Sequence, residues 1–290
     1  MAIDYRRLLN WKIPDIRHTY TLRDTIFYAL SVGYGANPED EAQLRYVYEK
    51  ELVVAPTMAT TIAAPAGWLR DPATGINSVG ILAGEQDFEI HRPLPVAGTL
   101  IGKSRVAEVV DLGKDRGAAI YTEREVYDES TNERVFAARA TTISRTDGGF
   151  GGPGRVNRPK TVMPERAPDL VCDIATADNA ALVFRLHNPL DPKHADQHAD
   201  LALARKLGHR RPSLHGLYTL GVAGHALLRS VCNYDATRLK SMGVRFSAAA
   251  YPGDTLRTEI WRDGGTVLFQ CRSMQRDKIV LSNGRARIED

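Results

Sequence analysis

The stretch that decides the fold is PSLHGLYTLGVAGHALL, from Pro212 to Leu228. It is dense in glycine, alanine and leucine, a composition that suits a helix wrapped closely by a sheet better than a helix on the surface. Segments rich in valine, isoleucine and threonine follow it and are typical of strands: TLRTEIWRDGG, TVLFQCRSM and KIVLSNGRARI. The residues Asp263, Gly264 and Gly265 are expected to form a hairpin turn between the first two. This order predicts a central helix enclosed by an antiparallel sheet.

The same order occurs earlier in the chain. Pro212 and Pro56 are 156 residues apart, as are Leu256 and Leu100. Two shorter matches obey nearly the same offset, TLRDTIFYAL with TADNAALVFRL and FEI with VRF, and a repeat of this length indicates duplicated structural units. The segment PTMATTIAAPAGWL, from Pro56, is therefore expected to form a second small-residue helix, followed by the strands GAAIYTEREVYDES and VFAARATTIS.

A short capped helix should open each half. Thr21, with Asp24 three residues later, and Thr176 both precede apolar residues at helical spacing. Between the halves, GGFGGPGRVNRPKTVMPERAPD is rich in Gly, Pro and Arg and is the predicted linker. We therefore expect a unit over 1–147, a linker over 148–169 and a second unit over 170–290. The fold class is α+β: two tandem hot-dog units, each a central helix wrapped by a curled antiparallel sheet, with their sheets side by side.

Composition excludes several classes of function. The 38 basic and 35 acidic residues give a net charge of only +3, spread along the chain, which disfavours nucleic acid as a partner. The three cysteines lie far apart without CxxC spacing and are expected to be free thiols in a reducing compartment. The first residues contain no apolar run, so neither a signal peptide nor a membrane anchor is expected, and the cytoplasm follows by elimination.

The histidines are distributed unevenly. Six of the eight fall between His187 and His225, which suggests that the second half carries the chemistry, although surface histidines in a polar segment would give the same pattern. Within this run Asp191 precedes His194, and HADQ is followed by HADL. We expect His194 and His198 to share one helix face.

This set suits the addition of water to a double bond conjugated to a thioester. The reaction needs a base for the water, an acid for the alpha carbon and amide donors for the enolate oxygen. The donors would come from the helix start at His215 and Gly216. Close packing explains Gly216 equally well, and His215 suits a buried supporting role. A metal site of Asp191, His194 and His198 is a further alternative, although this chemistry needs no metal.

Longer segments resemble a known family. In the first half they are FYALSVGYG, LRYVYEKELVVAPT and GEQDFEIHRPLPVAGTL, and in the second ALVFRL, RRPSLHGLYTLGVAGHALL and YPGDTLRTEIW. Over nearly the whole chain these segments are similar to the double hot-dog MaoC-like dehydratases, which include type 2 enoyl-CoA hydratases and 3-hydroxyacyl-thioester dehydratases.

The resemblance implies reversible hydration of a trans-2-enoyl-CoA to a 3-hydroxyacyl-CoA, usually the R isomer. Chemistry would lie in the second half and the acyl chain in the first. An acyl-CoA thioester would be the partner, with no further cofactor, and the chain would form a homodimer. Lys206, Arg210 and Arg211 either meet phosphates of the acyl carrier or form a solvated basic helix end.

The family's motif after Arg-Leu is approximately Ser-Gly-Asp-x-Asn-Pro-Leu-His-x-Asp-Pro, with the first Asp and the His as the catalytic pair. Counted from the Arg-Leu pair, the His falls on His194 but the Asp on Pro189. Counted back from the proline before the helix, the His falls on His198 and the Asp on Lys193. Matching Asn-Pro-Leu directly puts Asp191 at the His position. The motif is thus disrupted in every register.

Asp191, from a shifted loop, is the preferred replacement carboxylate. The candidate catalytic residues are Asp191, His194 and His198, and the candidate oxyanion or substrate-binding residues are Gly216, His215 and Asp196. No metal ligand is assigned. Two other functions stay open: an acyl-CoA binding or partner subunit with altered chemistry, and a hot-dog thioesterase.

Overall fold

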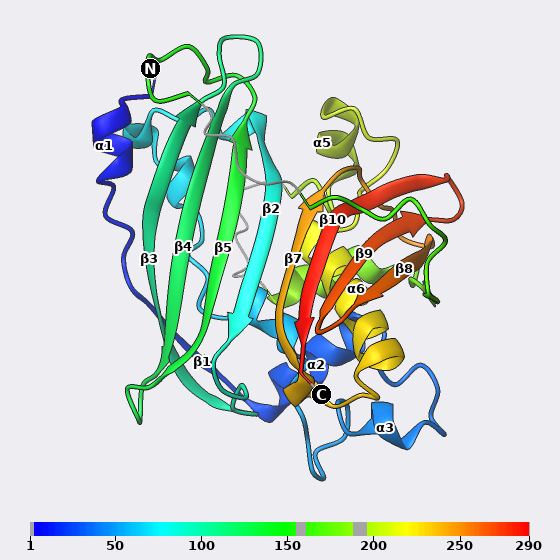
Figure 1. Ribbon diagram of the computed structural model, residues 1–290. Coiled ribbons are helices and arrows are strands. Elements are labelled where there is room, and N and C mark those ends of the chain that lie inside the picture. Colours follow the sequence, from blue (N-terminus) through cyan, green and yellow to red (C-terminus); the bar gives the residue numbers. More distant parts are fainter. Residues whose placement is uncertain (1–2, 155–160, 188–195, 290) are drawn as a thin grey trace.

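The computed structural model describes residues 3–154, 161–187 and 196–289. Its centre is one antiparallel sheet in the order β1-β3-β4-β5-β2-β7-β10-β9-β8-β6 (Figure 1). The first half contributes β1 Ile16–Tyr20, β2 Ile81–Ile90, β3 Gly98–Asp111, β4 Ala118–Asp128 and β5 Arg134–Ser144. The second contributes β6 Leu170–Ala175, β7 Leu239–Phe246, β8 Thr255–Asp263, β9 Thr266–Ser273 and β10 Lys278–Ile288. Read inward from either edge, the two halves have the same strand order, which is the structural form of the repeat.

The two halves meet at the pair β2 and β7. These strands are counterparts in the repeat and run antiparallel, with Gln86 opposite Val244 and Phe88 opposite Met242. The prediction that the two units pair their sheets side by side is therefore confirmed. The predicted hairpin is also confirmed, because Asp263 pairs with Thr266 across a two-residue turn.

Among the described residues, one α-helix is sixteen residues long and the others are shorter. They are α1 Tyr5–Leu9, α2 Leu22–Ser31, α3 Glu41–Leu44, α4 Ala180–Phe184, α5 Leu201–Lys206 and α6 Gly216–Val231. The described residues also form the 3₁₀ helices η1 Pro56–Thr60, η2 Trp68–Arg70, η3 Pro72–Thr74, η4 Ser78–Gly80, η5 Arg185–His187 and η6 Ala236–Arg238.

One of the two predicted helix starts is confirmed. Thr21 is the N-cap of α2, and the Asp24 carboxylate accepts a hydrogen bond from the Thr21 amide at 2.8 Å. The prediction for Thr176 is wrong, because Asn179 is the N-cap of α4. The Thr176 hydroxyl instead donates to the carbonyl of Asp254 at 2.8 Å and joins two loops.

The long helix α6 is the core of the second half, as expected from its composition. It begins at Gly216 rather than at Pro212, because the segment before it is extended and the Leu214 amide donates to the Ala250 carbonyl at 2.8 Å. Its small residues allow the first half of the chain to pack closely against it. A Cβ on Gly224 would lie 2.3 Å from the Thr57 side chain. Figure 1 shows α6 against the strands of the second half.

The prediction of a counterpart helix in the first half is wrong. PTMATTIAAPAGWL forms only η1, turns and the first two residues of η2, because Ala63 and Gly67 adopt positive φ and Pro65 cannot continue a helix. The buried guanidinium of Arg124 on β4 donates to the carbonyls of Ala59 and Thr60, at 2.8 and 3.3 Å, and so satisfies groups that a longer helix would have paired internally.

The three cysteines are unpaired and buried, as predicted for free thiols. Within the described ranges, every helix is too short or too polar to span a lipid bilayer.

Candidate active site

Four of the six candidate residues gather just before α6. Asp196, His198, His215 and Gly216 come from the turn before α5 and from the start of α6. One ring nitrogen of each histidine and one carboxylate oxygen of Asp196 all lie within 4.8 Å of one another. The other two candidates, Asp191 and His194, lie outside the described residues.

The ring of His198 is oriented by the backbone. Its Nδ1 lies 2.8 Å from the carbonyl oxygen of Ser213. Because a carbonyl can only accept, Nδ1 carries the proton and Nε2 presents its lone pair. Burial lowers the pKa of His198 below its usual value of 6.5. His198 is therefore a neutral imidazole, and its basic Nε2 lies 3.4 Å from the side-chain amide nitrogen of Gln197.

The prediction that His198 lies on a helix is wrong, and His194 lies outside the described residues. His198 lies in a turn, and α5 begins three residues later at Leu201. Asp200 ends the turn as the N-cap, since its carboxylate accepts from the Leu203 amide at 2.9 Å. Aspartate is a favourable N-cap residue. Because Asp200 caps α5, the helix begins after His198 rather than before it.

His215 lies face to face with His198. The ring centroids are 3.7 Å apart with 26° between the planes, and Phe184 of α4 lies 5.3 Å from the His215 ring. Burial, with smaller contributions from neighbouring histidines and an arginine, lowers the pKa of His215 to about 2. Its buried Nδ1 has no hydrogen-bond partner among the described residues. His215 therefore stays neutral and adds a desolvated wall to the site.

Asp196 is held close to His198 from two sides. Its Oδ1 accepts from the backbone amide of His198 at 2.9 Å, and its Oδ2 lies 3.6 Å from Nε of Arg185. Stacked imidazoles do not direct two ring-plane lone pairs at one point, so this trio departs from the usual geometry of a chelated metal. The earlier metal alternative involves Asp191 and His194, which lie outside the described residues.

Gly216 occupies the first position of α6. The side chain of the N-cap, His215, makes no capping hydrogen bond, so the first-turn amides and the positive helix end face the site without it. A Cβ on Gly216 would lie 2.9 Å from the Phe246 ring. Close packing therefore explains this glycine, and its role as an amide donor to the substrate stays a prediction.

Three contributors were missed by sequence reasoning: Arg185, Ser213 and His187. His187 reaches the first half, with Nε2 3.1 Å from the Ser31 hydroxyl of α2, and burial lowers its pKa to about 4. The signal for Arg185 was its place in the Arg-Leu pair, and that for His187 was the histidine cluster. Nothing in the sequence marks the carbonyl of Ser213 as a partner.

Comparison with known proteins identifies relatives of both halves of the chain. The model of the MFE-2 hydratase 2 N-terminal domain matches residues 18–146, and that of the MaoC like domain matches residues 160–284. The peroxisomal enoyl-CoA hydratase 2 of Arabidopsis thaliana is 35% identical over 95% of this chain and 92% of its own length. The 3-hydroxyacyl-thioester dehydratase Y of Mycobacterium tuberculosis is 34% identical over 91% of each chain.

A solved structure extends the likeness to three dimensions. The MaoC-like dehydratase from Phytophthora capsici superimposes with a TM-score of 0.84 and 31% identity, over 98% of both chains. Both halves are thus covered, by sequence and by structure. This chain belongs to the family of MaoC-like dehydratases and type 2 enoyl-CoA hydratases.

Proposed function

We propose that this chain catalyses the reversible hydration of a trans-2-enoyl-CoA to a 3-hydroxyacyl-CoA, with His198 as the base. The observation that carries the proposal is a neutral imidazole and a carboxylate side by side at the uncapped start of a buried helix. The names of the relatives support it from both directions, because the Arabidopsis protein is named a hydratase and the mycobacterial protein a dehydratase.

The chemistry follows from these positions. Nε2 of His198 takes a proton from water as the water oxygen bonds to C3 of the substrate. The electrons of the double bond move to the thioester oxygen, where the Gly216 amide and the helix dipole stabilise the developing negative charge. A proton from the imidazolium or from a carboxyl group then goes to C2. One water molecule has been added, and the reverse sequence removes it.

Asp196 is our candidate for the carboxylate of this pair. Two hydrogen bonds of about 2.8 Å that meet at one water span about 4.6 Å. One ring nitrogen of His198 and one carboxylate oxygen of Asp196 lie at most 4.8 Å apart, and a water between Nε2 and this carboxylate is part of the proposal. Asp191, the replacement preferred from the sequence, and His194 stay candidates to be tested beside it. His215 is proposed to exclude water and to hold the His198 ring in place.

The first half is proposed to accommodate the acyl chain. Where the second half fills its curled sheet with sixteen residues of α6, the first half has only the short η1 at the corresponding place. The boundaries 147 and 170, a homodimer and a cytoplasmic location belong to this proposal. Limited proteolysis, sedimentation and cell fractionation test them.

Crotonyl-CoA hydration tests the assignment through loss of the ultraviolet absorption of the conjugated thioester. His198→Ala is expected to lower kcat by about 100-fold or more, the usual contribution of a positioned base. Asp196→Asn, Asp191→Asn and His194→Ala, measured in parallel, identify the carboxylate and any second imidazole. His91→Ala, an exposed histidine of the first half, is the control and should keep full activity.

The same assay separates the other functions. Release of free thiol from crotonyl-CoA would indicate a thioesterase, and binding without either reaction would indicate a binding subunit. Full hydration activity in His198→Ala would rule out the proposed base.

A further inference from the structure

A polar cavity lies beside the segment that leads into α6. It has a volume of about 280 Å³ and lies between the segment before Pro212, the loop from Tyr251 to Asp254 and the turn at Gln275. Its charged lining consists of three arginines and two aspartates: Arg210, Arg211, Arg276, Asp178 and Asp254. The net charge of this lining is therefore +1.

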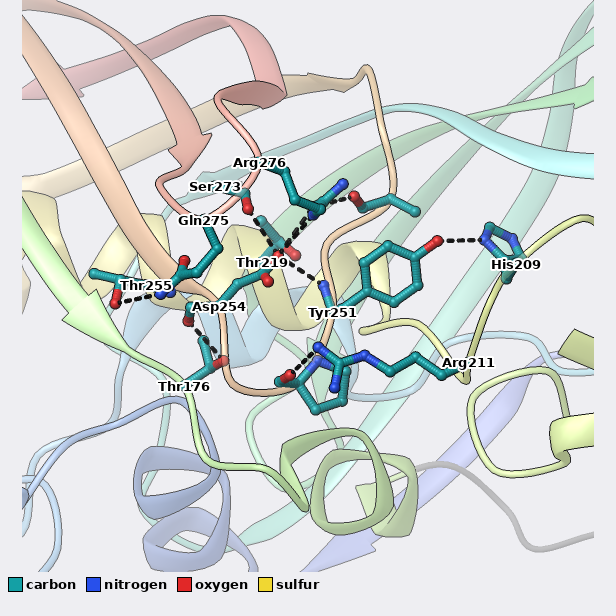
Figure 2. A network of polar contacts seen from close by, with 12 residues as sticks. Thr176, His209, Arg211, Thr219, Tyr251, Asp254, Thr255, Ser273, Gln275 and Arg276 are labelled. Atoms are coloured by element: carbon teal, nitrogen blue, oxygen red, sulfur yellow. Dashed lines mark hydrogen bonds and ion pairs between the residues drawn. The ribbon is translucent and has the colours of Figure 1, made fainter.

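Arg276 forms an ion pair within the fold. Its guanidinium lies 2.9 Å from the carboxylate of Asp254, whose side chain is only 4% exposed, and it also donates to the Ala249 carbonyl at 2.7 Å. Asp254 further accepts from the Ser273 hydroxyl at 2.8 Å (Figure 2). Arg276 thus holds the loop in shape, and its charge is neutralised.

Arg210 and Arg211 carry the charge that is left. Within the described residues neither has an ion-pair partner, and Asp178 is the remaining acidic group of the lining. Arg211 is already oriented: its Nη2 donates to the Pro252 carbonyl at 2.9 Å and its guanidinium carbon lies 5.7 Å from the centre of the Tyr251 ring. Figure 2 shows Tyr251 between Arg211 and Arg276. A fixed guanidinium with unused donors is suited to a phosphate.

The cavity is tied to the candidate active site. The Leu214 amide donates to the Ala250 carbonyl, which joins the loop below the cavity to the segment that enters α6. Gly216 is five positions after Arg211, so their Cα atoms lie at most about 18 Å apart. This is of the same order as the reach of an extended pantetheine arm.

We propose that this cavity binds a phosphate ester of the thioester carrier, with Arg210 and Arg211 as its ligands. The inference rests on the proposed hydratase function, because it assigns the phosphates of that same substrate. Of the three basic residues noted in the sequence, only Arg210 and Arg211 line the cavity, and Lys206 does not. Two phosphate groups of CoA share this chemistry: the phosphate next to pantetheine and those of the adenosine end.

Three substrates of increasing charge test the proposal: crotonyl-pantetheine, crotonyl-4′-phosphopantetheine and crotonyl-CoA. The variant Arg210→Gln/Arg211→Gln is expected to raise KM for crotonyl-CoA about tenfold, as for the loss of a charge-assisted contact, with kcat unchanged. KM for crotonyl-pantetheine should not change. Arg205→Gln, an exposed arginine of α5 outside the cavity, is the matched control.

The outcomes are distinct. Sensitivity of the phosphopantetheine substrate supports binding of the inner phosphate, and sensitivity of crotonyl-CoA alone supports binding at the adenosine end. An equal rise in KM for all three substrates, or no rise for crotonyl-CoA, overturns the proposal.

Calorimetric titration with CoA separates this proposal from the hydratase proposal. If the wild-type protein hydrates none of the three substrates, the hydratase function fails. Weaker CoA binding in the double variant than in Arg205→Gln would still support the cavity, and equal binding would refute it.

Discussion

A histidine far from the proposed chemistry should make the protein sensitive to acid. His225 on α6 is 3% exposed and stacks on Tyr34 with ring centroids 3.8 Å apart and 14° between the planes. Its ring nitrogens lie 3.4 Å from the Val32 carbonyl and 3.3 Å from the Tyr234 hydroxyl. Burial is the main cause that lowers the pKa of His225 to about 4.

The size and sign of the effect follow from proton binding. In the unfolded chain a histidine titrates near 6.5, so between pH 6.5 and 4 the unfolded state binds more protons than the folded state. The stabilisation by the neutral ring is complete above pH 6.5 and is lost as the pH falls. At pH 5, 1.5 units below the unfolded pKa, the loss is about 2 kcal/mol for this residue alone, at 1.36 kcal/mol per unit.

Urea unfolding at pH 7 and pH 5 measures this loss. His225→Phe keeps a ring that can stack on Tyr34 but cannot take up a proton. The free energy of unfolding of the wild type should therefore fall by about 2 kcal/mol more than that of His225→Phe. If wild type and His225→Phe lose equal stability between the two pH values, the buried neutral imidazole is not the cause.

Three further results are expected. The lowered pKa of His198 places the acidic fall of kcat/KM for crotonyl-CoA below pH 6.5, and a fall centred above 6.5 would contradict a buried neutral base. Gly216→Ala pushes against the Phe246 ring and should lower kcat/KM by about tenfold or more, whereas unchanged kinetics would show that the helix start tolerates displacement. Gly102→Ala would bring its Cβ within 2.2 Å of a backbone oxygen, so thermal and urea unfolding should show a loss of about 2 kcal/mol or more, whereas Gly154→Ala, with open space around it, should stay within about 0.5 kcal/mol of wild type.

The strands, the repeat and α6 could be predicted because their signals are local. Alternating strand segments and a turn such as Asp263-Gly264-Gly265 specify their own geometry. A nearly constant offset of 156 residues then indicates that both halves share one order of elements. The structure, and not the sequence, shows that the two sheets meet through β2 and β7.

The missing helix of the first half could not be predicted from composition alone. PTMATTIAAPAGWL has the small residues of its counterpart, but the positive φ of Ala63 and the carbonyls taken up by Arg124 depend on contacts distant in sequence. The site shows the same limit. The histidine cluster indicated the region, whereas the Ser213 carbonyl that orients His198 is a backbone group from another segment.

The shared sheet also bears on how such a chain can evolve. In a symmetric dimer of identical subunits, every substitution occurs in both subunits. A helix that is lost from one subunit is therefore lost from the other as well. Here β2 and β7 fix the same pairing within one polypeptide, and each half mutates on its own. The two halves of one chain can therefore diverge in function. One half can lose its long α-helix, while the other keeps the helix on which the proposed catalysis depends.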